Sequence, residues 1–155
     1  MSFEVRQLTA HDLDLMDAML ETFAQGFDDE ENYSHNRPSP EYLRRLLGRD
    51  TFIALVALQD EQVVGALAAY ELHKFEQERS ELYIYDLAVL EAYRRAGVAT
   101  GLIAHLQKLG AERGAWVIFV QADTDEDDQP AIALYTKLGT REEVLHFDIP
   151  ISREN

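Results

Sequence analysis

One short segment of the chain, residues 94–99, has the residue types and spacing of a phosphate-binding turn. It reads Arg94-Arg95-Ala96-Gly97-Val98-Ala99, follows an apolar segment at 82–90 and opens an amphipathic pattern that runs to about residue 113. Backbone N–H groups of such a turn, continued by the unpaired N–H groups of a helix N-terminus, form a concave anion site that the helix dipole favours. Gly97 lets a ligand approach the backbone closely, and small Ala99 keeps the first helical turn open. The segment therefore predicts a site for phosphate groups.

A second candidate for chemistry is Asp86, which lies inside the apolar segment 82–90. Strict alternation along this segment places Asp86 on one face with Ile84 and Ala88, and the residues at 83, 85, 87 and 89 on the other. A carboxylate in such a strand is costly unless it is paired or takes part in chemistry. Partial burial raises its pKa toward the range of a general base. The pattern fits such a base, and it also fits a structural aspartate held by the backbone or an arginine.

The distribution of charge indicates the kind of partner. The chain has 29 acidic and 14 basic side chains among 155 residues, which gives a net charge of -15. A field of this sign repels nucleic acid, so no nucleic-acid partner is expected. Carboxylates cluster at residues 28–31 and again at 123–128. Because crowded like charges destabilise a fold, the two blocks predict a cationic partner.

Several classes of protein are excluded by what the sequence lacks. It has no cysteine, which removes thiol nucleophiles and cysteine metal ligands. Its five histidines show no zinc spacing, so no metal is expected. It has neither a secretory signal nor an apolar run long enough to span a membrane, so we expect a cytoplasmic protein without a membrane partner.

Hydrophobic periodicity predicts the elements that must position these groups. Thr9 is the expected N-cap of the first helix, and Ser39 with Pro40 predicts the start of the second, which closes at Gly48. Gly139 is expected to end the last helix. The predicted elements are strands at 3–8, 51–58, 63–75, 82–90, 116–122 and 141–149, and helices after Thr9, at 40–47, from the 94–99 turn to about residue 113, and at 131–138.

The order of these elements predicts the fold class. The strand at 82–90, the helix that follows and the strand at 116–122 form a strand–helix–strand unit, whose two strands are parallel. The strands at 51–58, 63–75 and 82–90 are joined by short turns and are therefore antiparallel. We expect an α/β (α+β) fold with a mixed central sheet, antiparallel N-terminal strands, one parallel pair and flanking helices. A chain of this length is most simply one domain, residues 1–155.

The 94–99 turn and the element order resemble the GNAT superfamily of acetyltransferases. The signature of that superfamily has Gln or Arg, then Gly, then Gly or Ala, at the spacing of Arg94, Gly97 and Ala99. The resemblance implies acetyl-CoA as cofactor, with its pyrophosphate on this turn and its pantetheine arm on the splayed edge of the 82–90 strand. It also implies that Tyr135, in the pattern Ala-x3-Tyr-x-Lys-x-Gly, lies near the coenzyme sulfur. The implied cofactor-binding residues are Leu87, Ala88, Val89, Arg94, Arg95, Ala96, Gly97, Val98, Ala99, Thr100 and Tyr135.

A closer resemblance is to the aminoglycoside 3-N-acetyltransferases of type I. It rests on residues 83–89, 120–123, 133–139 and 146–148 read together, and it covers most of the chain from 75 to 149. It implies direct transfer of acetyl to the 3-amino group of an aminoglycoside, which confers resistance, with Asp86 at the amine and Tyr135 protonating the thiolate. Aminoglycosides are polycations, in agreement with the acidic blocks. The implied substrate-binding residues are Asp86, Asp123, Asp125, Glu126, Asp148, Glu30 and Glu31.

Two alternatives stay open from the sequence. A polyamine or protein N-terminal acetyltransferase of the same fold would also bind a cationic acceptor. A CoA-binding module without catalysis belongs to a different class. The drug spectrum and the oligomeric state are not given by the sequence, although GNAT enzymes of this size are often dimers, which leaves a homodimer open.

Overall fold

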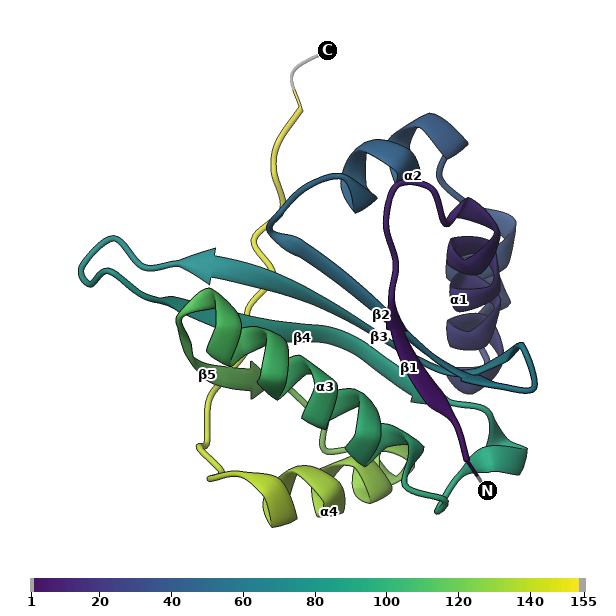
Figure 1. The fold of residues 1–155 in the computed structure, drawn as a ribbon. Coiled ribbons are helices and arrows are strands. Elements are labelled where there is room, and N and C mark those ends of the chain that lie inside the picture. The colour runs from purple at the N-terminus through teal and green to yellow at the C-terminus, as the bar shows by residue number, and fades with distance from the viewer. Residues whose placement is uncertain (1, 154–155) are drawn as a thin grey trace. The chain divides into compact units, whose positions relative to one another are not determined.

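The computed structural model describes residues 2–153, and the chain divides into two compact units. The first unit is Met1–Gln121 and the second is Ala122–Asn155. The first unit contains a five-stranded sheet with three α-helices, and the second contains helix α4 (Gln129–Leu138) (Figure 1). One domain over residues 1–155 stays a prediction.

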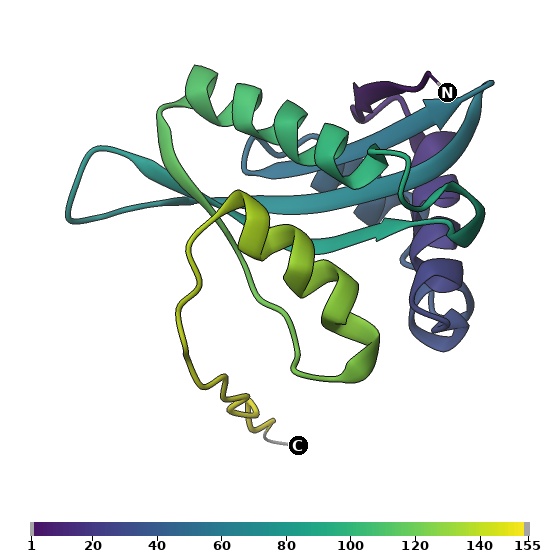
Figure 2. The ribbon, with the colours of Figure 1, turned by 90° about the horizontal axis from the view of Figure 1, so that it is seen from below.

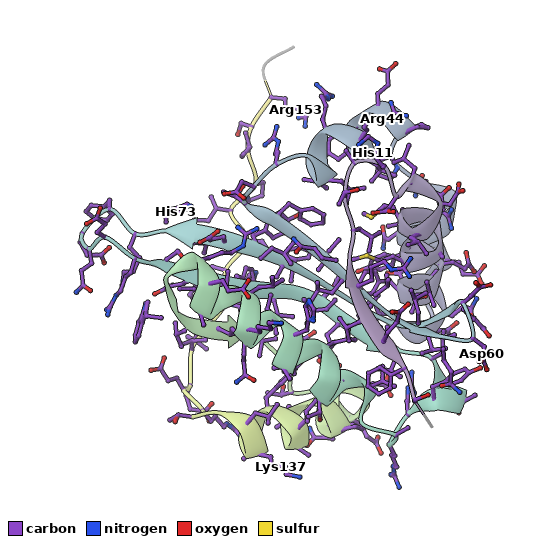
Figure 3. All side chains as sticks on the ribbon, viewed as in Figure 1. His11, Arg44, Asp60, His73, Lys137 and Arg153 are labelled. Carbon is purple, nitrogen blue, oxygen red and sulfur yellow. The ribbon has the colours of Figure 1, made fainter. Side chains whose placement is uncertain are left out.

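The sheet of the first unit is mixed, as the sequence predicts. Its strands lie in the order β1-β2-β3-β4-β5, and every neighbouring pair is antiparallel except β4 and β5, which are parallel. Positive φ angles at Asp60 and Glu61 form the tight turn between β2 and β3, and His73 ends β3 at its other end (Figure 3). The strands are β1 (Glu4–Gln7), β2 (Phe52–Gln59), β3 (Gln62–His73), β4 (Ser80–Val89) and β5 (Ala115–Val120).

Helices cover both faces of this sheet. Helices α1 (Leu13–Gly26) and α2 (Pro40–Leu47) cover one face, and α3 (Val98–Arg113) covers the other (Figures 1 and 2). Within the described part of the chain, none of the helices is long and apolar enough to cross a membrane. The core between α1, α2 and the sheet includes Met16, Met19, Phe23, Leu43, Leu47, Val56, Ala66 and Ala68.

Close backbone approach fixes where α3 lies on the sheet. A Cβ atom at Gly65 of β3 would lie 2.7 Å from Val98 Cγ1, at the first residue of α3. A Cβ atom at Gly101 would lie 2.7 Å from the Phe3 ring. Neither distance is compatible with a real side chain, so both glycines allow the N-terminus of α3 to pack tightly against the sheet and the N-terminal segment.

The helix caps confirm one prediction and correct another. Ser39 caps α2, since its hydroxyl accepts a hydrogen bond from the Tyr42 N–H at 3.2 Å, and Pro40 is the first helical residue. The prediction that Thr9 caps α1 is wrong, because the N-cap is Asp12. The Asp12 carboxylate accepts from the Thr9 N–H at 2.7 Å and from its hydroxyl at 3.1 Å. The two residues close a turn with each other, which delays the start of the helix.

The register between β3 and β4 shifts once, and this shift corrects the predicted alternation. Ile84 pairs with Ala69 and Asp86 pairs with Ala68, so Tyr85 is the extra residue of a β-bulge. Adjacent residues of β3 face opposite sides of the sheet, and cross-strand partners share a side. Asp86 therefore lies on the α1 side with Ala68, and Ile84 lies on the opposite side. The predicted grouping of Asp86 with Ile84 is wrong because strict alternation does not hold across a bulge.

The second unit confirms its predicted helix and contradicts its predicted strand. Helix α4 follows a short 3-10 turn (Glu126–Asp128) and ends at Gly139. Residues 141–149 form no strand, and Val144, Leu145 and Phe147 are exposed. A strand needs a neighbouring strand for its backbone hydrogen bonds, and the second unit contains none over its described residues 122–153. The alternating apolar pattern is present, but the pairing that would make it a strand is not.

A buried ion pair joins the end of α3 to β3. The Glu71 side chain is 2% exposed and accepts hydrogen bonds from Ser80 Oγ at 2.6 Å and from Arg113 Nη1 at 2.7 Å. Burial raises the pKa of Glu71, but the bonds from Ser80 and Arg113 outweigh it, so the pKa lies below its ordinary value. Because the folded-state pKa is lowered, the pair stabilises the fold above the unfolded-state pKa, and this contribution is lost as the pH falls through the folded-state value.

Replacing Arg113 by Met should lower the free energy of unfolding by about 3 kcal/mol at pH 7, because Glu71 is left buried without its charged partner. The loss should be smaller at pH 3 than at pH 7, because protonation of Glu71 increases as the pH falls. Urea unfolding followed by circular dichroism at both pH values measures it. Arg6→Met is the control, since Arg6 and Glu4 form an exposed pair at 51% and 64% exposure, for which we expect a loss under about 1 kcal/mol. Equal losses in the two variants would contradict the prediction.

Candidate active site

Asp86 lies at the β-bulge of β4 with its carboxyl group partly buried. The Tyr33 hydroxyl donates a hydrogen bond to Asp86 Oδ2 at 2.9 Å. Burial raises the pKa of Asp86 to about 6, against the opposing effect of the Tyr33 bond. The pKa rise expected from the sequence is therefore present, and at neutral pH the carboxyl group is largely ionised and able to accept a proton.

Tyr33 was not among the residues that the sequence singled out. It lies in a short helical segment, η1 (Glu31–His35), and is 53 residues from Asp86. Its ring packs against Phe23 and Phe27 of the α1 region, at centroid distances of 5.8 and 5.7 Å. Burial and the neighbouring charge of Asp86 raise the pKa of Tyr33, so its hydroxyl stays protonated. No local pattern marks the residue, because the contact exists only after α1 has packed on the sheet.

A row of aromatic side chains crosses the sheet beside Asp86. Tyr85, the bulge residue, is 61% exposed and makes edge contacts with Tyr70 at 5.8 Å and with Tyr83 at 6.0 Å. Tyr83 stacks on Phe119 of β5 at 4.7 Å, and its hydroxyl donates to the Gln121 side chain at 3.1 Å. Next to the carboxylate, the first unit thus presents a partly exposed aromatic surface with polar rims.

The 94–99 turn joins β4 to α3 through left-handed backbone. Arg95 has a φ of 64°, and Gly97, the N-cap of α3, has a φ of 82°. A Cβ atom at Gly97 would meet nothing within 4 Å, so the backbone there faces open space. The Gly101 N–H donates to the Gly97 carbonyl at 2.9 Å, while the N–H groups of the three residues between them have no intrahelical partner. This is the geometry of a backbone anion site.

The Arg94 side chain is engaged inside the first unit. Its Nε donates to the Val89 carbonyl at 3.0 Å, and its Nη2 donates to the Gly26 carbonyl at 3.4 Å. A Cβ atom at Gly26 would lie 2.9 Å from Ala88 Cβ, so the end of α1 touches β4 at this point. Arg94 thus links the end of β4 to the end of α1 and holds the start of the turn in place.

Strand β4 continues past the end of its pairing with β5. Their parallel pairing ends at Ile84 and Val120, whereas β4 continues to Val89. From Tyr85 onward, that edge of β4 has no neighbouring strand among the residues that the structure describes. An open strand edge of this kind can bind an extended ligand that carries amide groups.

The pairing of β4 with β3 decides which main-chain groups reach the open edge. The Leu90 N–H donates to the Val64 carbonyl at 2.9 Å. Because hydrogen bonding alternates along an antiparallel pair, Ala88 also directs its main-chain groups to β3, while Leu87 and Val89 direct theirs away from it. The Val89 carbonyl is the one that Arg94 holds. The open edge therefore presents the main chain of Leu87 and the N–H of Val89.

The acidic block of the first unit is connected to Asp86 through Tyr33. Glu31 is the first residue of η1, and Glu30 is its N-cap; both are exposed. Tyr33 follows two residues later and holds the Asp86 carboxylate. Glu30 and Glu31 therefore belong to the same short segment as the tyrosine that holds Asp86.

Tyr135 lies on α4 of the second unit and is partly buried. Burial and the charge of Asp128 raise its pKa. The phenol is consequently neutral at pH 7, which leaves it a proton to donate.

The predicted substrate carboxylates of the second unit are exposed. They are Asp123, Asp125, Glu126 and Asp148. The Asp123 N–H donates to Asp128 Oδ2 at 2.9 Å, which closes the acidic loop, and Asp148 Oδ1 lies 2.9 Å from His146 Nε2. Among the residues that the structure describes, no group of three or more His, Asp and Glu side chains could hold a metal ion.

The strand order, the parallel pair whose pairing ends at Ile84 and the turn into α3 define an acetyltransferase of the GNAT fold. Residues 15–140 match the acetyltransferase (GNAT) family model, and the chain belongs to that family. Enzymes of this family use acetyl-CoA. Among curated proteins, none matches the chain.

Solved structures show what this chain is similar to. An aminoglycoside acetyltransferase from an uncultured soil metagenomic sample is 63% identical, with a TM-score of 0.96 over 98% of this chain and 100% of that one. A second such enzyme from an uncultured soil metagenomic sample, in complex with sisomicin, is 30% identical, with a TM-score of 0.87 over 97% of each chain. An aminoglycoside 6′-N-acetyltransferase from Acinetobacter baumannii, 22% identical, has a TM-score of 0.73 over 97% of this chain and 100% of that one, and shares the fold.

Replacing Asp86 by Asn should stabilise the protein by about 1–2 kcal/mol at pH 8, because a carboxylate whose pKa is raised by burial opposes folding when it is ionised. The sign follows from the raised pKa of about 6. Protonation favours the folded state, so the Asp86 contribution is full below the unfolded-state value near 4 and is lost as the pH rises through about 6.

Urea unfolding at pH 4 and pH 8 measures this difference. The gain from Asp86→Asn should be present at pH 8 and nearly absent at pH 4. Glu78→Gln, at an exposed position of the β3–β4 turn, is the control and should change neither value. A variant that is less stable than the wild type at pH 8 would contradict the burial argument.

Proposed function

We propose that this protein is an aminoglycoside N-acetyltransferase that transfers acetyl from acetyl-CoA to the 3-amino group of the drug by direct attack in a ternary complex. The observation that carries the proposal is Asp86, a partly buried carboxylate with a pKa of about 6 that lies at the start of the open edge of β4. A base placed at the start of a cofactor-binding edge is positioned to serve an amine that approaches the cofactor there.

The relatives and the charge of the chain support this acceptor class. The 63% identical structure and the sisomicin complex are both of aminoglycoside acetyltransferases. An aminoglycoside is a polycation at neutral pH, and a chain of net charge -15 attracts it over long distances at low ionic strength. The position on the drug follows from the resemblance of residues 83–89 and their companion segments to the 3-N enzymes.

The backbone of β4 and of the 94–99 turn fits acetyl-CoA. We assign the pantetheine amides to the main chain of Leu87 and Val89, and the pyrophosphate to residues 95–100 and their N–H groups. Gly97 leaves room for close approach of phosphate oxygens. Ala88 lies between these two residues but is assigned no hydrogen bond to the cofactor, because its main chain pairs with β3. When bound, acetyl-CoA supplies the thioester acyl group that the amine attacks. The residues assigned to the pyrophosphate are Arg95, Ala96, Gly97, Val98, Ala99 and Thr100.

Asp86 prepares the amine for attack. Its Oδ2 is held by Tyr33, so Oδ1 is the atom assigned to the ammonium group. Above a pH of about 6 the carboxylate is charged; it orients the ammonium group and takes one of its protons, which frees the nitrogen lone pair. As the new C–N bond forms and the C–S bond breaks, the nitrogen releases its second proton to solvent. Tyr135 donates its phenolic proton to the departing thiolate and regains a proton from solvent. The raised pKa of Tyr135 keeps that proton available at neutral pH.

Exposed carboxylates and aromatic faces complete the proposed drug site. Glu30 and Glu31 lie next to the segment that holds Asp86, and we assign to them amino groups of the drug other than the one that reacts. The exposed ring of Tyr85 offers an apolar face to a sugar ring. From the second unit we assign Asp123, Asp125, Glu126 and Asp148 to the same cationic substrate.

Incubation with acetyl-CoA and a panel of amines tests the function through release of free thiol. We expect turnover with gentamicin-like and kanamycin-like acceptors, a product acetylated on the 3-amino group by NMR, and resistance in a sensitive host. Asp86→Ala should lower kcat/KM at least about 1,000-fold with acetyl-CoA affinity nearly unchanged. Preference for spermidine or a peptide N-terminus would favour the other acetyltransferases, and absence of thiol release with every amine would favour a CoA-binding module.

Gly97→Ala should weaken acetyl-CoA binding about tenfold, because a Cβ atom at this left-handed position strains the turn and covers the anion site. Calorimetric titration with CoA measures the affinity. Gly114→Ala is a matched control: Gly114 caps the other end of α3 with a φ of 80°, and a Cβ atom there also meets nothing within 4 Å. Both variants should lose similar stability, and only Gly97→Ala should lose affinity; equal affinities would remove the turn from the cofactor site.

A further inference from the structure

Tyr33 leaves one oxygen of Asp86 available and holds the other. Its hydroxyl donates to Oδ2 at 2.9 Å, which fixes the plane of the carboxyl group. Oδ1 accepts no hydrogen bond from the residues that the structure describes. An incoming amine therefore meets a carboxylate that is already oriented, with its second oxygen free to take a proton.

The position of the Tyr33 hydroxyl is set by α1. The Tyr33 ring lies against Phe23 and Phe27, which stack on each other at 5.8 Å. The Tyr33 N–H donates to the Asp29 carbonyl at 3.3 Å, and the Asp29 N–H donates to the Ala24 carbonyl of α1 at 2.9 Å. The ring and the backbone of Tyr33 are thus both anchored to α1. The position of its hydroxyl therefore does not depend on the hydrogen bond to Asp86.

The same segment carries the acidic block. Asp29 Oδ1 accepts from the Asn32 N–H at 3.3 Å, and its Oδ2 accepts from Asn32 Nδ2 at 2.9 Å. These bonds close the turn that carries Glu30 and Glu31 and that leads directly into Tyr33. The carboxylates assigned to the drug and the hydroxyl that holds Asp86 therefore belong to one short, internally bonded segment.

We propose that Tyr33 is the positioning residue of Asp86, and that it makes the orientation of this base depend on the segment whose carboxylates bind the cationic acceptor. The inference rests on the proposed function, in which Asp86 Oδ1 takes a proton from the acceptor ammonium group. Tyr33 transfers no proton and makes no covalent bond. It acts through Asp86: its hydrogen bond occupies Oδ2 and leaves Oδ1 available to the acceptor.

The ionisable groups around this pair stay the same when the Tyr33 hydroxyl is removed. They are Asp29 from the turn, Tyr70 from β3, and Tyr83 and Tyr85 from β4. The Tyr33 bond lowers the pKa of Asp86 against the effect of burial. Loss of the hydroxyl should therefore raise the Asp86 pKa further, and a change in its titration reports on this bond.

The test is Tyr33→Phe in the full chain, which keeps the ring against α1. We expect the acid limb of kcat/KM to move to higher pH by about one unit, and kcat at pH 7 to fall about tenfold, with the KM for acetyl-CoA within about twofold of wild type. Tyr42→Phe, which removes the hydroxyl of a 53% exposed tyrosine on α2, is the matched control and should leave the profile unchanged. An acid limb in Tyr33→Phe that coincides with that of the wild type would overturn the proposal.

A second measurement does not depend on turnover. NMR titration of carboxyl carbons, with the Asp86 signal assigned through Asp86→Asn, should give a pKa near 6 in the wild type and a higher value in Tyr33→Phe. If the wild type acetylates no amine, the proposed function fails, and this titration still decides whether Tyr33 controls the carboxyl group. Equal titrations of Asp86 in the two proteins would show that it does not.

Discussion

The register shift between β3 and β4 is the constraint on which the rest of the site depends. A slip of one residue moves every following side chain of a strand to the other face of the sheet. Because Tyr85 is the extra residue, Asp86 turns from the α3 side to the α1 side and meets Tyr33. Without the bulge, the carboxylate would face the apolar contacts of α3, where Leu102 and Leu106 are fully buried.

The protonation of Asp86 results from two opposing effects in the same contact. Burial of the carboxyl group disfavours its charge, and the hydrogen bond from Tyr33 favours it. Their balance puts the pKa at about 6, so the group is charged at neutral pH yet basic enough to accept a proton. The raised pKa of Asp86 lowers the free energy of unfolding at neutral pH, since an ionised and partly buried carboxylate opposes folding. Such local conflicts with stability are typical of sites that carry chemistry.

The proposed cofactor site is built almost entirely from backbone. The open edge of β4 and the N-terminus of α3 are joined by one short connection, and Arg94 fixes its start to the Val89 and Gly26 carbonyls. Main-chain amides in these positions can bind the proposed cofactor regardless of which side chains lie next to them, provided that the cofactor can approach the chain closely. Gly97 leaves open space for such an approach, whereas the proposed acceptor contacts come from side chains of other elements.

The sequence determined the elements whose signals are local, and the tertiary structure decided the rest. Ser39 with Pro40 marks a helix start, and Gly97 marks the turn into α3, because a cap or a left-handed backbone depends on adjacent residues. The sequence predicted Asp86 as an unusual carboxylate and grouped it correctly with Ala88, but its grouping with Ile84 was wrong, since a bulge is a property of two paired strands. It did not find Tyr33, whose partner is 53 residues away, and it predicted a strand at 141–149 that no neighbouring strand of its unit completes. Periodicity gives the side chains that a segment can bury, while register and long-range contacts are fixed only when the elements pack against each other.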